Sequence, residues 1–136
     1  GYKVEIVEFT DYVLPNTSLE NGELDANYFQ HIAYLNSFNA DNGTHLTYTA
    51  EIHLEPMGAF SKKYKSVDEV KEGAVVAVPD DPSNEARALR VLAAAGLIEV
   101  KEGELITIAD ITSNPKNLEF KVLMLIKMHF MQKIKI

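Results

Sequence analysis

Residues 74 to 87 read Ala-Val-Val-Ala-Val-Pro-Asp-Asp-Pro-Ser-Asn-Glu-Ala-Arg. The apolar run Ala74–Val78 is typical of a strand that is buried on both faces of a sheet. Pro82 suits the first position of a helix, and the residues that follow predict a helix over Ser83–Ala95 that ends at Gly96. A buried strand that leads into a helix indicates an α/β fold with mostly parallel sheet strands.

Shorter elements are predicted on both sides of this strand and helix, from the spacing of apolar residues and from turn residues. The predicted strands are Lys3–Phe9, His45–Leu54, Met57–Ser61, Leu97–Val100, Glu104–Thr107 and Leu118–Val122. The predicted helices are Pro15–Leu24, Ile32–Phe38, Ser66–Gly73 with a capping box at its start, and a helical turn at Ile108–Thr112.

Composition and charge indicate the class of protein and exclude some classes of partner. The chain has 136 residues, of which 46% are hydrophobic and 24% charged, as in an ordinary soluble domain with a core. Its net charge of −7 argues against nucleic acid and anionic membranes as partners. There is no cysteine, so disulfides, thiol chemistry and a lipidated cysteine are excluded within these residues. The apolar run Val122–Ile126 is too short to span a bilayer.

No catalytic or metal-binding pattern stands out. The histidines His31, His45 and His53 do not have the spacing of metal ligands. The chain lacks a nucleophile elbow, a phosphate loop and a dinucleotide fingerprint. We therefore predict no catalytic residue, no metal and no cofactor, and expect that the protein is not an enzyme.

The predicted helix at residues 83–95 offers a site for a carboxylate. A helix N-terminus carries unpaired N–H groups and a partial positive charge, and a parallel strand delivers it to the edge of the sheet where ligands bind. Arg87 has a planar guanidinium that suits a carboxylate, and Asn84, three residues earlier, can donate or accept a hydrogen bond beside it. The alternative is a surface helix on which Arg87 pairs with Glu85 or a nearby aspartate.

Aromatic residues are concentrated between Gly22 and Tyr34, where Tyr28, Phe29, His31 and Tyr34 occur among small polar residues. Such residues can line a small pocket. In a helix, Phe29 and His31 would point to opposite sides, whereas in an extended segment they point the same way. A pocket therefore requires residues 27–31 to be extended and the helix to begin near position 33. The alternative is that Phe29, Ile32 and Leu35 are core residues.

These motifs together resemble a known family, the NlpA-type methionine-binding lipoproteins, which are substrate-binding subunits of methionine ABC importers. The resemblance runs from about Tyr2 to about Lys121. It is carried by motifs that follow one another in the family's order: Phe9-Thr-Asp-Tyr12, Pro15-Asn16, Gly22-Glu-Leu-Asp-Ala-Asn-Tyr-Phe-Gln-His31, Tyr34-Leu35, His53-Leu-Glu-Pro-Met-Gly58, Ser61-Lys-Lys-Tyr64, Pro79-Asp-Asp-Pro-Ser-Asn-Glu-Ala-Arg87-Ala-Leu89 and Asn114-Pro-Lys-Asn-Leu118.

The resemblance implies a fold and a ligand. The expected fold is a two-lobed, periplasmic-binding-protein-like (type II) α/β structure, here incomplete, with residues 1–44 in the first lobe and 45–122 in the second. It implies a pocket around the methionine side chain, with Asn84 and Arg87 at the amino-acid head group and Glu55 as a further polar contributor. The residues implied for the pocket are Tyr12, Phe29, His31 and Tyr34.

The resemblance also implies partners and a location. The expected partners are L- or D-methionine and the membrane subunits of an ABC importer. The expected location is extracytoplasmic, with a lipid anchor in the full-length protein and outside this chain.

Two departures from the family set a second expectation. The family's first strand and helix are missing, and residues 123–136 form an apolar and basic tail without acids, glycine or proline. We therefore expect the isolated chain to bind methionine weakly or not at all. The alternative function is a truncated, non-binding fragment that self-associates through unpaired strand edges and its tail.

Overall fold

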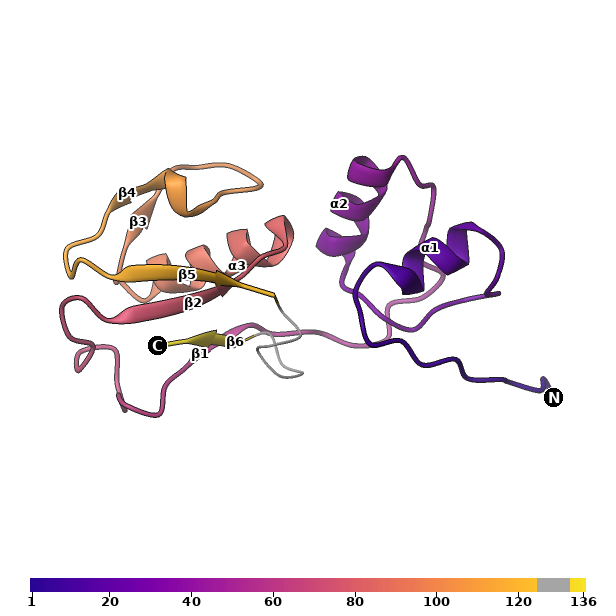
Figure 1. Cartoon of the computed structure of the whole chain (residues 1–136), viewed down its shortest axis with the longest axis horizontal. Coiled ribbons are helices and arrows are strands. Elements are labelled where there is room, and N and C mark those ends of the chain that lie inside the picture. Colours follow the sequence, from indigo (N-terminus) through magenta and orange to yellow (C-terminus); the bar gives the residue numbers. More distant parts are fainter. Residues whose placement is uncertain (125–132) are drawn as a thin grey trace. The chain divides into compact units, whose positions relative to one another are not determined.

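The computed structural model describes residues 1–124 and 133–136, and the chain divides into two compact units, Gly1–Ile52 and His53–Ile136 (Figure 1). The longest helix in the described part has 13 residues. No helix among these residues is long and apolar enough to cross a membrane.

The first unit contains two helices, α1 (Leu14–Glu20) and α2 (Ile32–Asn42). Both were predicted, although α2 continues past the predicted end at Phe38. It stops at Gly43, whose φ of 66° lies in the left-handed region that glycine tolerates, and the N–H of Gly43 donates to the carbonyl of Asn39. Leu35 and Phe38 are the buried apolar residues of α2.

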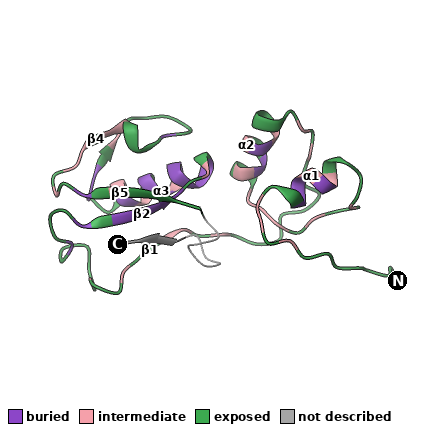
Figure 2. Ribbon diagram, in the orientation of Figure 1, coloured by how far each residue is buried: buried purple, intermediate pink, exposed green. Residues whose placement is uncertain are grey.

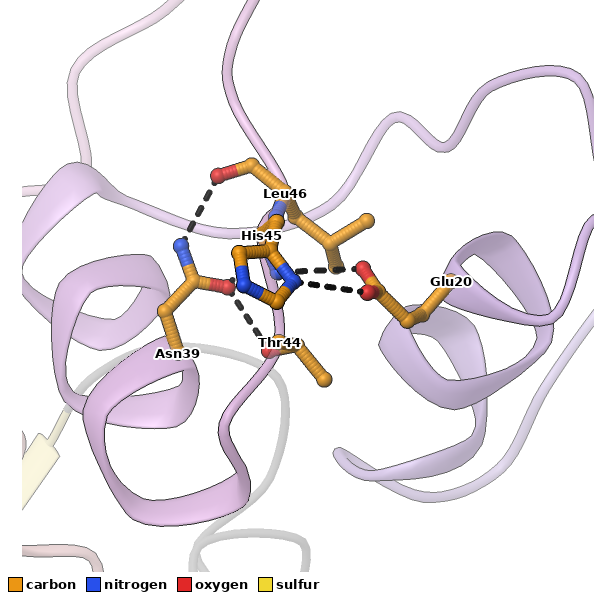
Figure 3. A network of polar contacts seen from close by, with 5 residues as sticks. All are labelled: Glu20, Asn39, Thr44, His45 and Leu46. Atoms are coloured by element: carbon orange, nitrogen blue, oxygen red, sulfur yellow. Dashed lines mark hydrogen bonds and ion pairs between the residues drawn. The ribbon is translucent and has the colours of Figure 1, made fainter.

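A network of hydrogen bonds attaches residues 44–46, which follow α2, to both helices (Figure 3). The Asn39 side chain donates to the Leu46 carbonyl at 2.8 Å and accepts from the Thr44 hydroxyl at 2.7 Å. The Glu20 carboxylate, at the end of α1, accepts from the backbone N–H of His45 at 3.1 Å. Side-chain hydrogen bonds thereby attach residues 44–46 to both helices.

The predicted strands Lys3–Phe9 and His45–Leu54 are wrong, because neither segment forms a strand. Alternating apolar residues express only a propensity, and a strand forms when a neighbour pairs with its backbone N–H and C=O groups. No strand in the described part of the chain pairs with either segment. Their large apolar side chains are accordingly exposed, among them Tyr2, Val4, Ile6, Tyr48 and Ile52.

The second unit is built on a four-stranded sheet in the order β1-β6-β2-β5. The pairs β1/β6 and β2/β5 are parallel, and β2/β6 is antiparallel. The sheet thus has the mostly parallel character that was predicted, and the strands near 57–61, 74–78 and 118–122 are confirmed. Their bounds are β1 (Gly58–Phe60), β2 (Val75–Pro79), β5 (Glu119–Leu123) and β6 (Lys133–Lys135).

Helix α3 (Pro82–Ala94) follows β2 directly, as predicted, and supplies much of the core. Leu89 and Leu92 of α3 and Val76 and Val78 of β2 are fully buried, and Figure 2 shows the buried residues gathered on these two elements. The helix ends where the N–H of Leu97 donates to the Leu92 carbonyl, a closure that needs the φ of +73° at Gly96. The start of α3 is fixed separately by its N-cap Asp81, whose side chain accepts from the backbone N–H of Asn84.

A small second sheet pairs β3 (Glu99–Val100) with β4 (Ile111–Ser113), and the one-turn 3₁₀ helix η1 (Ile108–Asp110) precedes β4. The predicted strand at Glu104–Thr107 is wrong, because the carbonyls of Gly103 and Glu104 accept from the Arg90 guanidinium and Thr107 caps η1.

The predicted helix at Ser66–Gly73 is also wrong. The Glu69 carboxylate accepts from the backbone N–H of Lys65, and the segment makes two separate turns, closed by the N–H groups of Val70 and Ala74 on the carbonyls of Val67 and Lys71. In a capping box the Glu69 carboxylate would bond to the backbone N–H of Ser66, and here it bonds to the residue before it instead. The predicted tail, residues 123–136, lies largely outside the described residues, apart from its two ends.

Candidate functional site

Four of the predicted site residues lie together in the first unit, and we call them the aromatic group: Tyr12, Phe29, His31 and Tyr34. The ring of Tyr34 lies 6.0 Å from Tyr12, 5.8 Å from Phe29 and 6.4 Å from His31, measured between centroids. The rings meet edge to face, a favourable arrangement for aromatic side chains. Each of the four is half-buried, so one side of the group is packed and another remains accessible.

The backbone of residues 26–31 explains how Phe29 and His31 join one group. This segment is outside any helix, and His31 has an extended backbone with ψ of 161°. Helix α2 begins at Ile32, one residue before the expected position 33. The simpler alternative of a core cluster fits Leu35, which is buried, but not Ile32, which is exposed.

A buried amide holds this segment against α1. Asn16 is fully buried, and its side-chain amide forms a reciprocal pair with the Gln30 amide at 2.6 and 2.7 Å. The Asn27 amide donates to the Asn16 oxygen at 3.0 Å and to the Pro15 carbonyl at 3.1 Å. These contacts could not be predicted from the sequence, because they join positions 11 to 14 residues apart. The only signal in the sequence was their place in the family motifs.

The Nδ1 atom of His31 and the hydroxyl of Tyr34 both form hydrogen bonds with the backbone. The Nδ1 of His31 accepts from the backbone N–H of Tyr34 at 3.1 Å and so caps α2. A nitrogen that accepts carries no proton, so the neutral ring has its proton on Nε2. The Tyr34 hydroxyl donates to the Tyr12 carbonyl at 2.6 Å. These bonds set the ring positions in the aromatic group.

Replacing Tyr34 by Phe isolates the hydroxyl from the ring. Tyr34→Phe should lower the free energy of unfolding of the first unit by about 1 kcal/mol, the usual value of one hydrogen bond. Thermal melting followed by near-ultraviolet circular dichroism measures the change. The control is Tyr48→Phe, at an exposed tyrosine. An equal effect of both substitutions would contradict a specific contribution from the bond between Tyr34 and Tyr12.

The second group of predicted residues, in the second unit, centres on Arg87. Its Nη1 donates to the Asn84 side-chain oxygen at 2.8 Å, and its Nη2 donates to the backbone carbonyl of Glu55. Burial lowers the pKa of Arg87, while the charges of Glu55 and Asp81 raise it. An arginine remains protonated under such opposing effects, so a half-buried cation is held in a defined place.

Asn84 and Glu55 contact Arg87 in different ways. Asn84 is 1% exposed, and its amide contacts Asp81 on one side and Arg87 on the other. Glu55 holds Arg87 through its backbone carbonyl, while its carboxylate lies 2.8 Å from the Nε2 of His53. The alternative pairing partner, Glu85, is buried and accepts from the Ile108 N–H at 3.0 Å.

The chemistry of these groups is that of binding. Aromatic edges and faces contact apolar or sulfur-containing groups, and a guanidinium contacts a carboxylate. Within the described ranges, no group of three or more metal-ligating side chains is present.

Comparison with known proteins gives a consistent set of matches. The family model described as NlpA lipoprotein matches residues 1–125. The D-methionine-binding lipoprotein MetQ of Salmonella typhi is 48% identical over 121 residues, which are 88% of this chain and 45% of that protein. MetQ of Escherichia coli is 46% identical over 121 residues, again 88% of this chain and 45% of that protein. The chain therefore spans about half the length of the curated relatives it matches.

Solved structures share the fold. A nutrient-binding protein from Burkholderia cenocepacia bound to methionine matches with a TM-score of 0.87 and 42% identity, over 90% of this chain and 53% of that one. A periplasmic substrate-binding protein of an ABC transporter from Coxiella burnetii matches with a TM-score of 0.86 and 43% identity, over 90% and 52%. The fold is therefore the α/β fold of substrate-binding proteins, as far as the matched residues extend.

Proposed function

This chain belongs to the NlpA lipoprotein family, and on that premise we propose that it captures methionine for an ABC importer. The observation that carries the proposal is the aromatic group, in which four rings are packed on one another and each stays half-buried. Relatives named for methionine binding, and a similar structure bound to methionine, support it.

Each group of residues, taken within its own unit, is suited to one part of an amino acid. We propose that the aromatic group contacts the thioether of methionine, since sulfur against an aromatic ring gains about 0.3–1.5 kcal/mol per contact. Arg87 binds the α-carboxylate, and the Glu55 carboxylate offers a partner for the ammonium group. In this proposal residues 1–44 belong to one lobe and residues 45–122 to the other. The protein acts by binding, without catalysis.

The wider setting follows from the family. We propose that the full-length protein is extracytoplasmic and lipid-anchored, and that it delivers methionine to the membrane subunits of an ABC importer. The support comes from relatives named as lipoproteins and from a similar structure named as an ABC-transporter substrate-binding protein.

A second candidate is a fragment that self-associates rather than binds. The observation that favours it is the row of exposed apolar side chains in residues 2–7 and 48–54, in segments without a partner strand among the described residues. Extended segments of this kind can pair with a second copy of the chain.

The experiment titrates the ¹⁵N-labelled chain with L- and D-methionine and follows the resonances of both groups. Norleucine, which replaces the sulfur by a methylene, is the matched control. One sulfur–aromatic contact predicts that methionine binds about 2- to 10-fold more tightly than norleucine. Light scattering over a range of concentrations gives the molar mass. Because the isolated chain is expected to bind methionine weakly or not at all, the same titration is made on the full-length protein, and no response of its spectrum to millimolar methionine contradicts the first proposal. A molar mass of this chain that does not rise with concentration contradicts the second.

A further inference from the structure

The side-chain amide of Asn84 lies between a carboxylate and a guanidinium. Its Nδ2 donates to both carboxylate oxygens of Asp81, at 3.0 and 3.1 Å, and its Oδ1 accepts from Nη1 of Arg87 at 2.8 Å. Asn84 is 1% exposed, so these contacts are made away from water. Asp81, Asn84 and Arg87 therefore form a continuous chain of hydrogen bonds at the start of α3.

Asp81 decides which way the amide faces. An ionised carboxylate only accepts hydrogen bonds, so the NH₂ group of Asn84 has to face Asp81. The carbonyl end of the same amide then has to face Arg87, which only donates. If the amide were reversed, each of its ends would meet a group of its own kind. Asp81 thus determines, through Asn84, the amide orientation that holds the Arg87 guanidinium.

Asp81 is fixed by contacts of its own. It is the N-cap of α3, where it accepts from the backbone N–H of Asn84 at 2.9 Å, and it also accepts from the Ser83 hydroxyl at 2.8 Å. With the Glu55 carbonyl on its Nη2, Arg87 is then held at two nitrogens by groups from two segments of the second unit.

We propose that Asp81 is a positioning residue for the carboxylate-binding arginine, and that it acts through the amide of Asn84. On this proposal Asn84 also acts through Arg87, rather than by contacting the head group as the sequence led us to expect. The effect on ligand binding rests on the proposed function, whereas the hydrogen-bond relay is a property of the protein itself.

The test variant is Asp81→Ser, because serine is also a good N-cap and retains the capping of α3. Its hydroxyl cannot accept from the Asn84 amide in the two-oxygen manner of the carboxylate. The control is Ser83→Ala, which removes another contact of Asp81 but leaves Asn84 and Arg87 unchanged. Asn84→Ala, which breaks the relay and keeps the Asp81 cap, is the second variant if Asp81→Ser does not fold.

The first readout needs no ligand. In the ¹⁵N spectrum we expect the side-chain resonances of Asn84 and Arg87 to be shifted and well ordered in the wild type and in Ser83→Ala. In Asp81→Ser or Asn84→Ala, the Arg87 resonances should move towards those of a solvated guanidinium. Unchanged Arg87 resonances in a folded variant would overturn the relay, whatever the ligand proves to be.

The second readout compares methionine with methioninamide, which lacks the carboxylate. Asp81→Ser should reduce the preference for methionine about tenfold, the loss expected when a hydrogen bond that orders a charged group is removed. Removal of the negative charge of Asp81 would, by electrostatics alone, strengthen the binding of a carboxylate near Arg87 and so increase the preference for methionine. The relay predicts the opposite, a decrease in this preference. A preference that stays the same or increases would overturn the proposal.

The two readouts separate the two claims. If wild-type protein shows the ordered Arg87 resonances but no methionine-dependent change, the proposed function fails and the relay stands. If methionine binds but the preference and the Arg87 resonances are unaffected by Asp81→Ser, the relay fails and the proposed function stands.

Discussion

Arg87→Ala should reduce the affinity for methionine by about a hundredfold. The substitution would leave the ligand's carboxylate without its charged partner in a partly desolvated place, and breaking such a pair costs about 3 kcal/mol or more. The wild-type guanidinium is held ready by Asn84 and the Glu55 carbonyl, so little ordering is needed when the ligand arrives. The loss should be confined to ligands that carry a carboxylate.

Calorimetry or a resonance-shift titration measures this effect. Arg90→Ala is the matched control, because Arg90 lies on the same helix, is exposed, and contacts the carbonyls of Gly103 and Glu104. It should leave methionine affinity within about twofold of the wild type, as is usual for surface substitutions. Arg87→Ala should also bind methioninamide as the wild type does. Wild-type affinity for methionine in Arg87→Ala would refute the role given to this residue.

Asn16→Ala should destabilise the first unit by about 3 kcal/mol, more than an ordinary loss of one hydrogen bond. Asn16 is fully buried, and its removal leaves the Gln30 amide without its reciprocal partner and takes one acceptor from Asn27. A buried polar group left unsatisfied costs about 1–3 kcal/mol, and here two groups are affected. The segment that carries Phe29 would lose its attachment to α1.

Urea unfolding followed by resonances of the two units distinguishes a local effect from a general one. The matched control is Asn36→Ala, the same chemical change at an exposed position of α2, where alanine has the better helix propensity. We expect signals of residues 1–52 to unfold at lower urea and those of residues 53–136 to keep their midpoint. Equal stability of Asn16→Ala and Asn36→Ala would show that the buried amide pair is not what holds the segment.

The elements that could be predicted are those determined by neighbouring residues. The strand β2 and the helix α3 follow from an uninterrupted apolar run, a proline at the first helical position and a glycine at the end. The strands expected at Lys3–Phe9 and His45–Leu54 fail because strand formation depends on a partner elsewhere in the chain, which the alternation of apolar residues does not specify.

In the candidate site, too, only features that depend on neighbouring residues could be predicted. Phe29, His31 and Tyr34 were named from the sequence pattern and Tyr12 from the family resemblance, and an extended segment before α2 was recognised as the condition for Phe29 and His31 to meet. The supporting contacts of Asn16 could not be predicted, since they link α1 to positions 27 and 30. The direction of the Asn84 amide could not be predicted either. It depends on Asp81, which accepts hydrogen bonds, and on Arg87, which donates them.

The attachment of residues 27–31 has a consequence for substitutions within them. Asn27 and Gln30 fasten the segment through Asn16, whereas Phe29 and His31 contribute rings to the aromatic group. Position 29 contributes only a ring, whereas positions 27 and 30 contribute only attachment and His31 also caps α2. A substitution at position 29 would therefore change a ring of the proposed binding group and leave the amide pair of Asn16 and Gln30 in place.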